Sequence, residues 1–200
     1  MSPLAVIKSK LELIMENDIE KLKFPIGKYK AILEFNFSRT IKDIKTLESF
    51  ANNLRDSVKG LDKTDFKKTY RDGGMNIAQI IHHYCDTHTY AFLRTKHSLL
   101  EDNPSVKMYE VSEFLTTSES NVLDVEDSLN VIQGIHAKWV SLLKTLSEDD
   151  FKRTYYHSVR DKNIILHEHV GMYAWHTKHH IVHIGMAKES IKEKGKRSKQ

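Results

Sequence analysis

Four long stretches of the chain repeat apolar residues at the three-to-four-residue spacing of an amphipathic helix, and no proline lies within any of them. The 200 residues include only three prolines and eight glycines, a composition that disfavours a fold with many turns. The stretches extend from about residue 39 to 58, from 76 to 100, from 125 to 146 and from 166 to past 186. Gly60 is expected to end the first helix, and Asn76 to cap the second. We therefore predict an all-α protein, an antiparallel four-helix bundle.

The segments between the helices differ in length. Residues 101–121 form a long connection rich in turn residues, so we expect no continuous helix there. This length predicts a crossover between the second and third helices, and the bundle need not be simple up-and-down. Around Arg160 and Asp161 the helical pattern is lost, which predicts a small two-stranded excursion.

Three regions follow from this pattern. We expect an N-terminal extension with a helical pattern at residues 1–22, a bundle domain at 23–190 and a basic tail at 191–200. The net charge of +4 is concentrated in the tail, whose last nine residues are KEKGKRSKQ. Because this short basic segment contains no aromatic residue, no nucleic-acid partner is predicted.

Composition excludes several other classes of protein. With 40% apolar and 29% charged residues, the chain is expected to be globular. No apolar run approaches the roughly 18–20 residues that a membrane span needs, and the N-terminus does not resemble a secretory signal. Cys85 is the only cysteine, so no intramolecular disulfide can form. We predict a cytoplasmic protein with no membrane partner.

Eleven of the twelve histidines are crowded into residues 82–97 and 157–183, and their spacing indicates a metal site. His176 and His180 are four residues apart, so one face of a helix can present both imidazoles to one ion. His179 and His183 have the same spacing. A helical projection places the first pair nearest the main apolar face and His179 further outward. A second, smaller apolar stripe weakens the assignment of His176 and His180 to the buried face without reversing it; the stripe consists of Trp175, Val182 and Met186.

The second predicted helix contains a further pair, His82 and His83. Metal sites in helix bundles are built from inward residues on facing helices, which favours a shared site with the fourth helix. A partly buried histidine with one hydrogen bond is the structural alternative for each position. Pattern alone supports the two interpretations equally and leaves the ligand set open.

Several segments resemble the DinB-like family of four-helix-bundle proteins. GGMNIAQIIHHYCDTH resembles the second-helix signature of the family, in which a ligand histidine is followed three residues later by an aspartate. This match implies that His83 is the ligand, with Asp86 as the aspartate. WHTKHHIVHIG resembles the C-terminal HxxxH of the family, which implies His176 and His180 as the other ligands.

The resemblance is closer to the YfiT branch of metal-dependent hydrolases, which is linked to bacillithiol S-transferase activity. The similar segments cover roughly residues 23–186 in the same order: FPIGKY, TYRDGG, LLEDNPSVKMYE, IQGIHAKWVSLL, FKRTYYH and MYAWHTKHHIVHI. Met75 departs from the family, which usually has tryptophan before the second helix. That departure concerns packing at the helix entrance and not the ligands.

The resemblance implies one divalent transition-metal ion per chain, zinc or nickel, held by three histidines. Such a site leaves a fourth position for water or a thiolate. We expect hydrolysis of a small substrate, or transfer of a low-molecular-weight thiol to a small electrophile, in a homodimer. The rival interpretations are a metal-binding stress-response protein without catalysis and a helical interaction module without metal.

Six further residues are weaker candidates. We expect His136 to be a core residue or to orient a ligand, and Asp86 to accept a hydrogen bond from a ligand imidazole. Tyr156 and His157 are candidates for the mouth of the pocket. Tyr173 is either a core residue or a proton donor, and Cys85 is expected to be inert.

Overall fold

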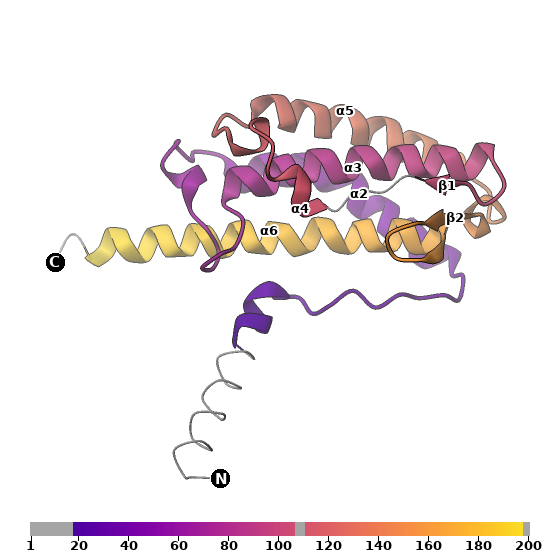
Figure 1. Cartoon of the computed structure of the whole chain (residues 1–200), viewed down its shortest axis with the longest axis horizontal. Coiled ribbons are helices and arrows are strands. Elements are labelled where there is room, and N and C mark those ends of the chain that lie inside the picture. The colour runs from indigo at the N-terminus through magenta and orange to yellow at the C-terminus, as the bar shows by residue number, and fades with distance from the viewer. Residues whose placement is uncertain (1–17, 107–110, 198–200) are drawn as a thin grey trace, which may run out of the picture.

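The computed structural model describes residues 18–106 and 111–197, and a bundle of four long helices dominates it (Figure 1). These helices are α2 (Phe37–Val58), α3 (Ile77–Leu100), α5 (Glu126–Leu143) and α6 (Leu166–Arg197). The four predicted helices are confirmed to within a few residues at each described end. Residues 18–23 are also helical, whereas the remainder of the predicted N-terminal extension, residues 1–17, lies outside the described residues. Helix α6 continues to Arg197 and so includes most of the segment expected to be a basic tail.

Local chemistry explains where α2 ends and α3 begins. Gly60 has a φ of +78°, a left-handed conformation that follows the end of α2. Asn76 caps α3, because its side chain accepts a hydrogen bond from the backbone N–H of Gln79. The side chain of Gln79 in turn accepts from the backbone N–H of Asn76, which completes a capping box. Both predicted helix ends are confirmed.

The order of the helices around the bundle is α2, α5, α3 and α6. Hydrogen bonds from Gln79 to Asn121 and from Arg55 to Glu126 place the start of α5 beside the start of α3 and the end of α2. Helices α3 and α5 therefore run parallel, as do α2 and α6, whereas the neighbouring pairs α2/α5 and α3/α6 run antiparallel (Figure 1). The predicted crossover accounts for this arrangement, since the chain returns along the whole bundle between α3 and α5.

Short elements occupy the connections. The crossover contains α4 (Val111–Phe114) and the 3-10 turn η2 (Glu119–Asn121), and the other two 3-10 turns are η1 (Asp65–Lys67) and η3 (Asp150–Lys152). A small sheet has the order β1 (Ser105–Val106), β2 (Thr154–His157) and β3 (Lys162–Ile165). Strands β2 and β3 are the predicted two-stranded excursion, with Asp161 in the turn at a φ of +47°. The parallel pairing of β1 with β2 was not predicted, because it joins segments about fifty residues apart.

Two apolar clusters fill the bundle. One lies towards the start of α3 and is centred on Phe50, Ile80 and Tyr84. The other lies towards the start of α6 and is centred on Leu47 and Trp139. Between them lies a layer of buried imidazoles. No helix in the described part of the chain is long and apolar enough to cross a membrane.

The segment before α2 runs antiparallel along the outer side of α6 (Figure 1). The Leu22 carbonyl accepts a hydrogen bond from His183, and the Phe24 ring lies 5.9 Å from the His179 ring. The hydroxyl of Tyr29 donates to the carbonyl oxygen of Glu168 at 3.1 Å. This segment packs against Trp175 of the second apolar stripe and against His179 and His183, and both histidines are buried. The projection that turned His179 outward took no account of this cover and was wrong.

Candidate metal centre

Helices α3 and α6 bring together His83, His176 and His180, the three predicted ligands. One ring nitrogen from each lies within 4.8 Å of the others. The Nε2 atoms of His83 and His176 are 3.0 Å apart. Two nitrogens bound to one tetrahedral zinc ion lie about 3.3–3.4 Å apart, given bonds of about 2.0–2.1 Å. The His83 and His176 rings therefore need to separate by only a few tenths of an ångström to accept an ion between them.

The three imidazoles are neutral at neutral pH, as metal ligands must be. Burial lowers the pKa of His83 to about 4. Burial, together with the neighbouring imidazoles, also holds the pKa values of His176 and His180 well below the ordinary value. Protonation would therefore not compete with a metal ion until the solution becomes acidic.

A chain of hydrogen bonds determines which nitrogen of His176 is free. His136 Nδ1 lies 2.9 Å from the Leu47 carbonyl, which can only accept, so His136 carries its proton on Nδ1. The neutral His136 therefore accepts at Nε2 from His88 Nδ1 at 2.8 Å. His88 in turn accepts at Nε2 from His176 Nδ1 at 3.0 Å. His176 is left with a lone pair on Nε2, the atom that faces His83.

A second series of hydrogen bonds sets the position of the proton on His180. His183 Nε2 donates to the Leu22 carbonyl at 3.1 Å, so the neutral ring has its lone pair on Nδ1. That atom lies 3.1 Å from His180 Nδ1 and can accept its proton. His180 then has a free lone pair on Nε2. Hydrogen bonds of this kind fix the tautomer of metal-binding histidines in many proteins.

The alternative pair from the sequence also forms a cluster. Single ring nitrogens of His179, His180 and His183 lie within 4.8 Å of one another. Tyr70 stacks on His183 with ring centroids 3.8 Å apart, and the segment around Phe24 covers His179. An ion in this cluster would have little room for a substrate. His176, in contrast, is partly exposed, which leaves the first cluster open on one side.

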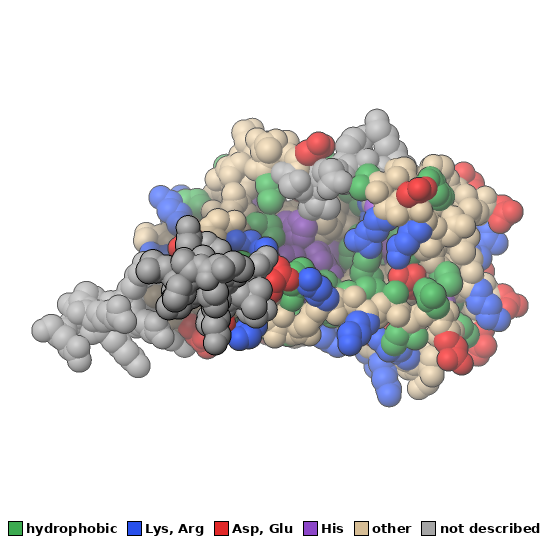
Figure 2. Space-filling view, turned by 60° about the horizontal axis from the view of Figure 1, so that its bottom comes forward, with side chains coloured by type: hydrophobic (Ala, Val, Ile, Leu, Met, Phe, Trp, Pro, Cys, Tyr) green, Lys and Arg blue, Asp and Glu red, His purple; other side chains and the backbone are tan. Residues whose placement is uncertain are grey.

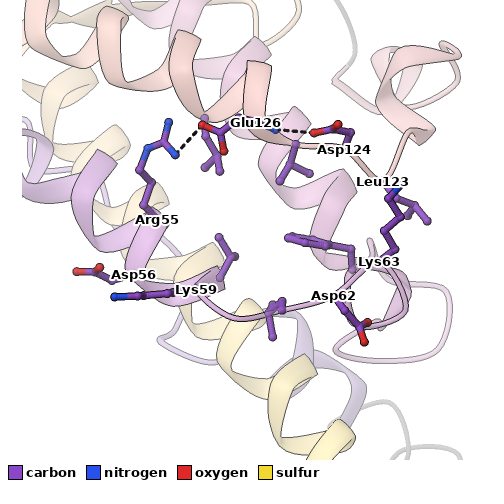
Figure 3. A pocket seen from close by; sticks show the side chains of 13 residues that line it. Arg55, Asp56, Lys59, Asp62, Lys63, Leu123, Asp124 and Glu126 are labelled. Atoms are coloured by element: carbon purple, nitrogen blue, oxygen red, sulfur yellow. Dashed lines mark hydrogen bonds and ion pairs between the residues drawn. The ribbon is translucent and has the colours of Figure 1, made fainter.

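Figure 2 shows histidine side chains at the bottom of a hollow on one face of the molecule. Lys and Arg side chains lie beside the hollow, on the side towards the β strands (Figure 2). A second cavity, of about 690 Å³, lies between the end of α2 and the start of α5 (Figure 3). Its rim carries charges of both signs, including the ion pair of Arg55 with Glu126 (Figure 3). No histidine or cysteine lines this cavity, so it lacks the nitrogen and sulfur donors that the histidine cluster offers.

His82 points away from the three predicted ligands. Its Nε2 donates to the Val122 carbonyl at 3.0 Å, and its Nδ1 lies 2.8 Å from the hydroxyl of Ser128. Both ring nitrogens are therefore engaged with α5 and the turn before it. Tertiary contacts thus distinguish His82 from His83, which spacing alone could not do.

The weaker candidates have separate positions. His136 is 2% exposed and reaches the cluster only through His88. No hydrogen bond joins Asp86 to the three predicted ligands. Burial and the neighbouring Glu119 carboxylate raise the pKa of Asp86, and His82 opposes part of this shift. Burial raises the pKa of the half-buried Cys85 thiol, which disfavours a nucleophilic thiolate.

The remaining candidates lie at the sheet and at the start of α6. His157 is buried, and its Nδ1 accepts a hydrogen bond from the backbone N–H of Arg160. The hydroxyl of Tyr156 lies outside the core and donates a hydrogen bond to the Asp161 carboxylate. Tyr173 is buried, and its hydroxyl accepts a hydrogen bond from Arg94 at 3.0 Å. Met75 packs against the first apolar cluster.

His88 and Arg94 were not singled out in the sequence. His88 is wholly buried and is the link between His136 and His176. No fixed spacing connects it with histidines on α5 or α6, so only the abundance of histidine pointed to this layer.

Comparison with known proteins identifies the class to which this protein belongs. The model of the DinB superfamily matches residues 46–184, and the chain belongs to this superfamily. Within it, the chain belongs to a branch of YfiT-like proteins. "Putative metal-dependent hydrolase YfiT" of Bacillus subtilis is 34% identical over 163 residues, which cover 82% of this chain and 92% of that protein. A relative in Geobacillus thermodenitrificans named "Putative metal-dependent hydrolase" is 35% identical over 83% of this chain and 93% of its own length.

Solved structures agree with the fold. The structure of Bacillus subtilis YfiT has a TM-score of 0.82 at 33% identity and covers 86% of this chain and 98% of its own. It is described as having "an unusual four-helix bundle topology". A mycothiol-dependent maleylpyruvate isomerase has a TM-score of 0.60 at 13% identity, covering 76% of this chain and 64% of its own, and shows a shared fold alone.

Proposed function

We propose that this protein uses one divalent transition-metal ion, zinc or nickel, to hydrolyse a small substrate or to transfer a low-molecular-weight thiol to a small electrophile. The ion would be held by His83, His176 and His180 within the bundle domain. The names of the YfiT-like relatives support the hydrolase form. The family resemblance supports the thiol-transfer form. Homodimerisation rests on the same resemblance and stays a prediction.

The convergence of three neutral imidazoles is the observation that supports this proposal. Two carbonyl groups, of Leu47 and Leu22, set the tautomers of His176 and His180, so that each ring keeps a free lone pair on Nε2. Three nitrogen ligands suit zinc and nickel alike, and they leave room for a further ligand. The ion would supply a Lewis acid that lowers the pKa of water or a thiol and polarises an electrophile.

The protein residues would orient and isolate the reacting groups. His136 and His88 hold the His176 ring, and His183 holds the His180 ring. The two apolar clusters shield the imidazole layer from water on either side. In hydrolysis, the oxygen of water bonds to the acyl carbon, and the leaving group departs with a proton. In thiol transfer, the thiol loses its proton, its sulfur bonds to an electrophilic carbon, and the leaving group departs with its electron pair.

Metal analysis of protein purified without a histidine tag tests the ligand set. We expect about one equivalent of metal in the unaltered protein and less than about a tenth in His83→Ala and His176→Ala. His82→Gln is the matched control, because it alters the adjacent histidine and can preserve a bond to the Val122 carbonyl. It should retain about one equivalent.

Different outcomes separate the rival interpretations. Metal lost in His183→Gln but retained in His83→Ala would assign the ion to the alternative cluster. An unaltered protein without metal would favour an interaction module. Turnover of an activated ester, and of a model electrophile with a small thiol, would separate hydrolysis from transfer. Bound metal with no turnover of any such substrate would favour a stress-response protein that only binds metal.

A further inference from the structure

Arg94 is a buried cation without a counter-charge among the described residues. Its side chain lies in α3 and is 7% exposed. No described carboxylate oxygen lies within 4.0 Å of its guanidinium. Nη1 donates to the Tyr173 hydroxyl at 3.0 Å, whereas the buried Nε has no hydrogen-bond partner within the described ranges. The Tyr90 ring lies 5.5 Å from the guanidinium carbon and supplies an additional cation–π contact.

An unpaired buried charge is costly. Arginine does not lose its proton in proteins, so Arg94 cannot avoid this cost by becoming neutral. The penalty for burying a charged group is several kcal/mol, and one neutral hydrogen bond together with one aromatic contact offsets only part of it. A guanidinium with free N–H groups instead suits a carboxylate or phosphate, which it binds through paired hydrogen bonds.

Neighbouring groups add to the donors at this position. The oxygen of Tyr173 accepts from Arg94, and no described residue accepts the hydroxyl proton of Tyr173. The nearby Tyr155 differs, because its hydroxyl donates to His169 at 2.9 Å. Burial lowers the pKa values of His157 and His169, and the nearby guanidinium groups of Arg160 and Arg94 lower them further.

This group of donors lies beside the metal cluster. Arg94 follows His83 by eleven residues, so both lie on nearly the same face of α3, about 20° apart. Tyr173 precedes His176 by one turn of α6, and their ring centroids are 5.9 Å apart. Figure 2 shows Lys and Arg side chains beside the histidine hollow, towards the β strands.

We propose that Arg94 and Tyr173, with Arg160 at the edge, form a subsite for the anionic group of a substrate or thiol co-substrate. The ligand would carry a carboxylate or phosphate at one end and its reactive thiol or scissile bond at the other. The anion would bind the free N–H groups of Arg94 and the Tyr173 hydroxyl. This inference rests on the proposed function and narrows its substrate class to small anions.

Calorimetric titration of the metal-loaded full chain with inorganic phosphate, and separately with succinate, tests the subsite at constant ionic strength. We expect saturable binding that weakens about tenfold or more in Arg94→Met, because a charge-assisted hydrogen-bond pair is lost. Arg55→Met is the matched control, since Arg55 already pairs with Glu126 and Asn130. It should bind both anions as the unaltered protein does. The relative affinities of phosphate and succinate show which anionic group fits.

Two measurements separate this subsite from other roles. Anion binding should persist in metal-free His176→Ala; its loss there would place the anion on the ion and overturn the proposal. Without added anion, Arg94→Met should be at least as stable in urea as the unaltered protein. A less stable Arg94→Met with unchanged anion affinity would give Arg94 a packing role only. The absence of saturable binding to the unaltered protein would also overturn the subsite.

Turnover provides an independent comparison. For Arg94→Met we expect a higher KM for a substrate with a carboxylate, with little change for a neutral analogue and with the metal content unchanged. An equal rise in KM for both substrates would contradict the inference. If no substrate is turned over, the proposed reaction fails while the anion titration still tests the subsite.

Discussion

The position of one proton on an imidazole ring decides which nitrogen can bind a metal ion, and here two backbone carbonyls set that position. The Leu47 carbonyl acts through His136 and His88, and the Leu22 carbonyl acts through His183. Each chain ends on a histidine of the candidate centre with its Nε2 lone pair free. Residues far from the proposed ion therefore determine how it would be held.

Replacement of His136 tests this effect at the residue scale. His136→Leu removes the link between the Leu47 carbonyl and His88, so we expect metal affinity to fall about 10–100-fold. His136→Gln can still donate to the carbonyl and accept from His88, and it should recover much of the affinity. Competition with a chromophoric chelator measures both. Equal affinity in His136→Leu and the unaltered protein would show that the chain does not orient His176.

At the scale of elements, each helix that contributes a ligand is held in place in a different way. Helix α3 is held at its start by its own capping box, whereas α6 is covered by the segment before α2. Gly171 allows the segment before α2 to lie close against α6, because a Cβ at this position would lie 3.3 Å from both the Tyr29 hydroxyl and an Asp43 carboxylate oxygen. The predicted helices were confirmed because capping and apolar spacing are local properties.

The capping box gives a prediction at this scale. Asn76→Ala leaves the first-turn N–H groups of α3 without their side-chain partner, so we expect it to lower the free energy of unfolding by about 1 kcal/mol. Asn53→Ala, in the exposed middle of α2, should change it by less than about 0.5 kcal/mol. Urea denaturation measures both. Metal content should not change, because His83 lies well inside α3. Equal stability of the two variants would contradict the role of the cap.

For the whole molecule, the layer of buried imidazoles links stability to pH. Burial lowers the pKa of His136 to about 4 and that of His169 to about 3, below the value of about 6.5 for an exposed histidine. Between these values the unfolded chain binds more protons than the folded chain. The free energy of unfolding should therefore be largest above about pH 6.5 and fall as the pH is lowered towards 4.

Urea denaturation of the metal-free protein at pH 7.5, 6 and 5 tests this linkage. We expect a loss of several kcal/mol across the series, since each unit of pKa difference corresponds to about 1.4 kcal/mol. His169→Gln retains groups that can bond Tyr155 and the Ala91 carbonyl but cannot titrate. Its stability should fall less steeply. Parallel profiles for the two proteins would show that His169 does not contribute.

The sequence by itself determined the features that depend on neighbouring residues. Helical spacing predicted α2, α3, α5 and α6, and the i, i+4 spacing placed His176 and His180 on one face. Family resemblance then selected His83 from the pair on α3. The candidate set therefore required both local spacing and a longer sequence pattern.

Only the tertiary structure decided which side chains meet across the bundle. The Val122 carbonyl engages His82, residues before α2 bury His179, and His88 joins α5 to α6. Arg94 likewise looks like an ordinary helical residue in the sequence, and only the structure shows that it is buried with no counter-charge in the described part of the chain. These features join segments that are tens of residues apart in the chain. Helical periodicity gives the direction of a side chain on its own helix, whereas hydrogen bonding and burial depend on what the fold places opposite it.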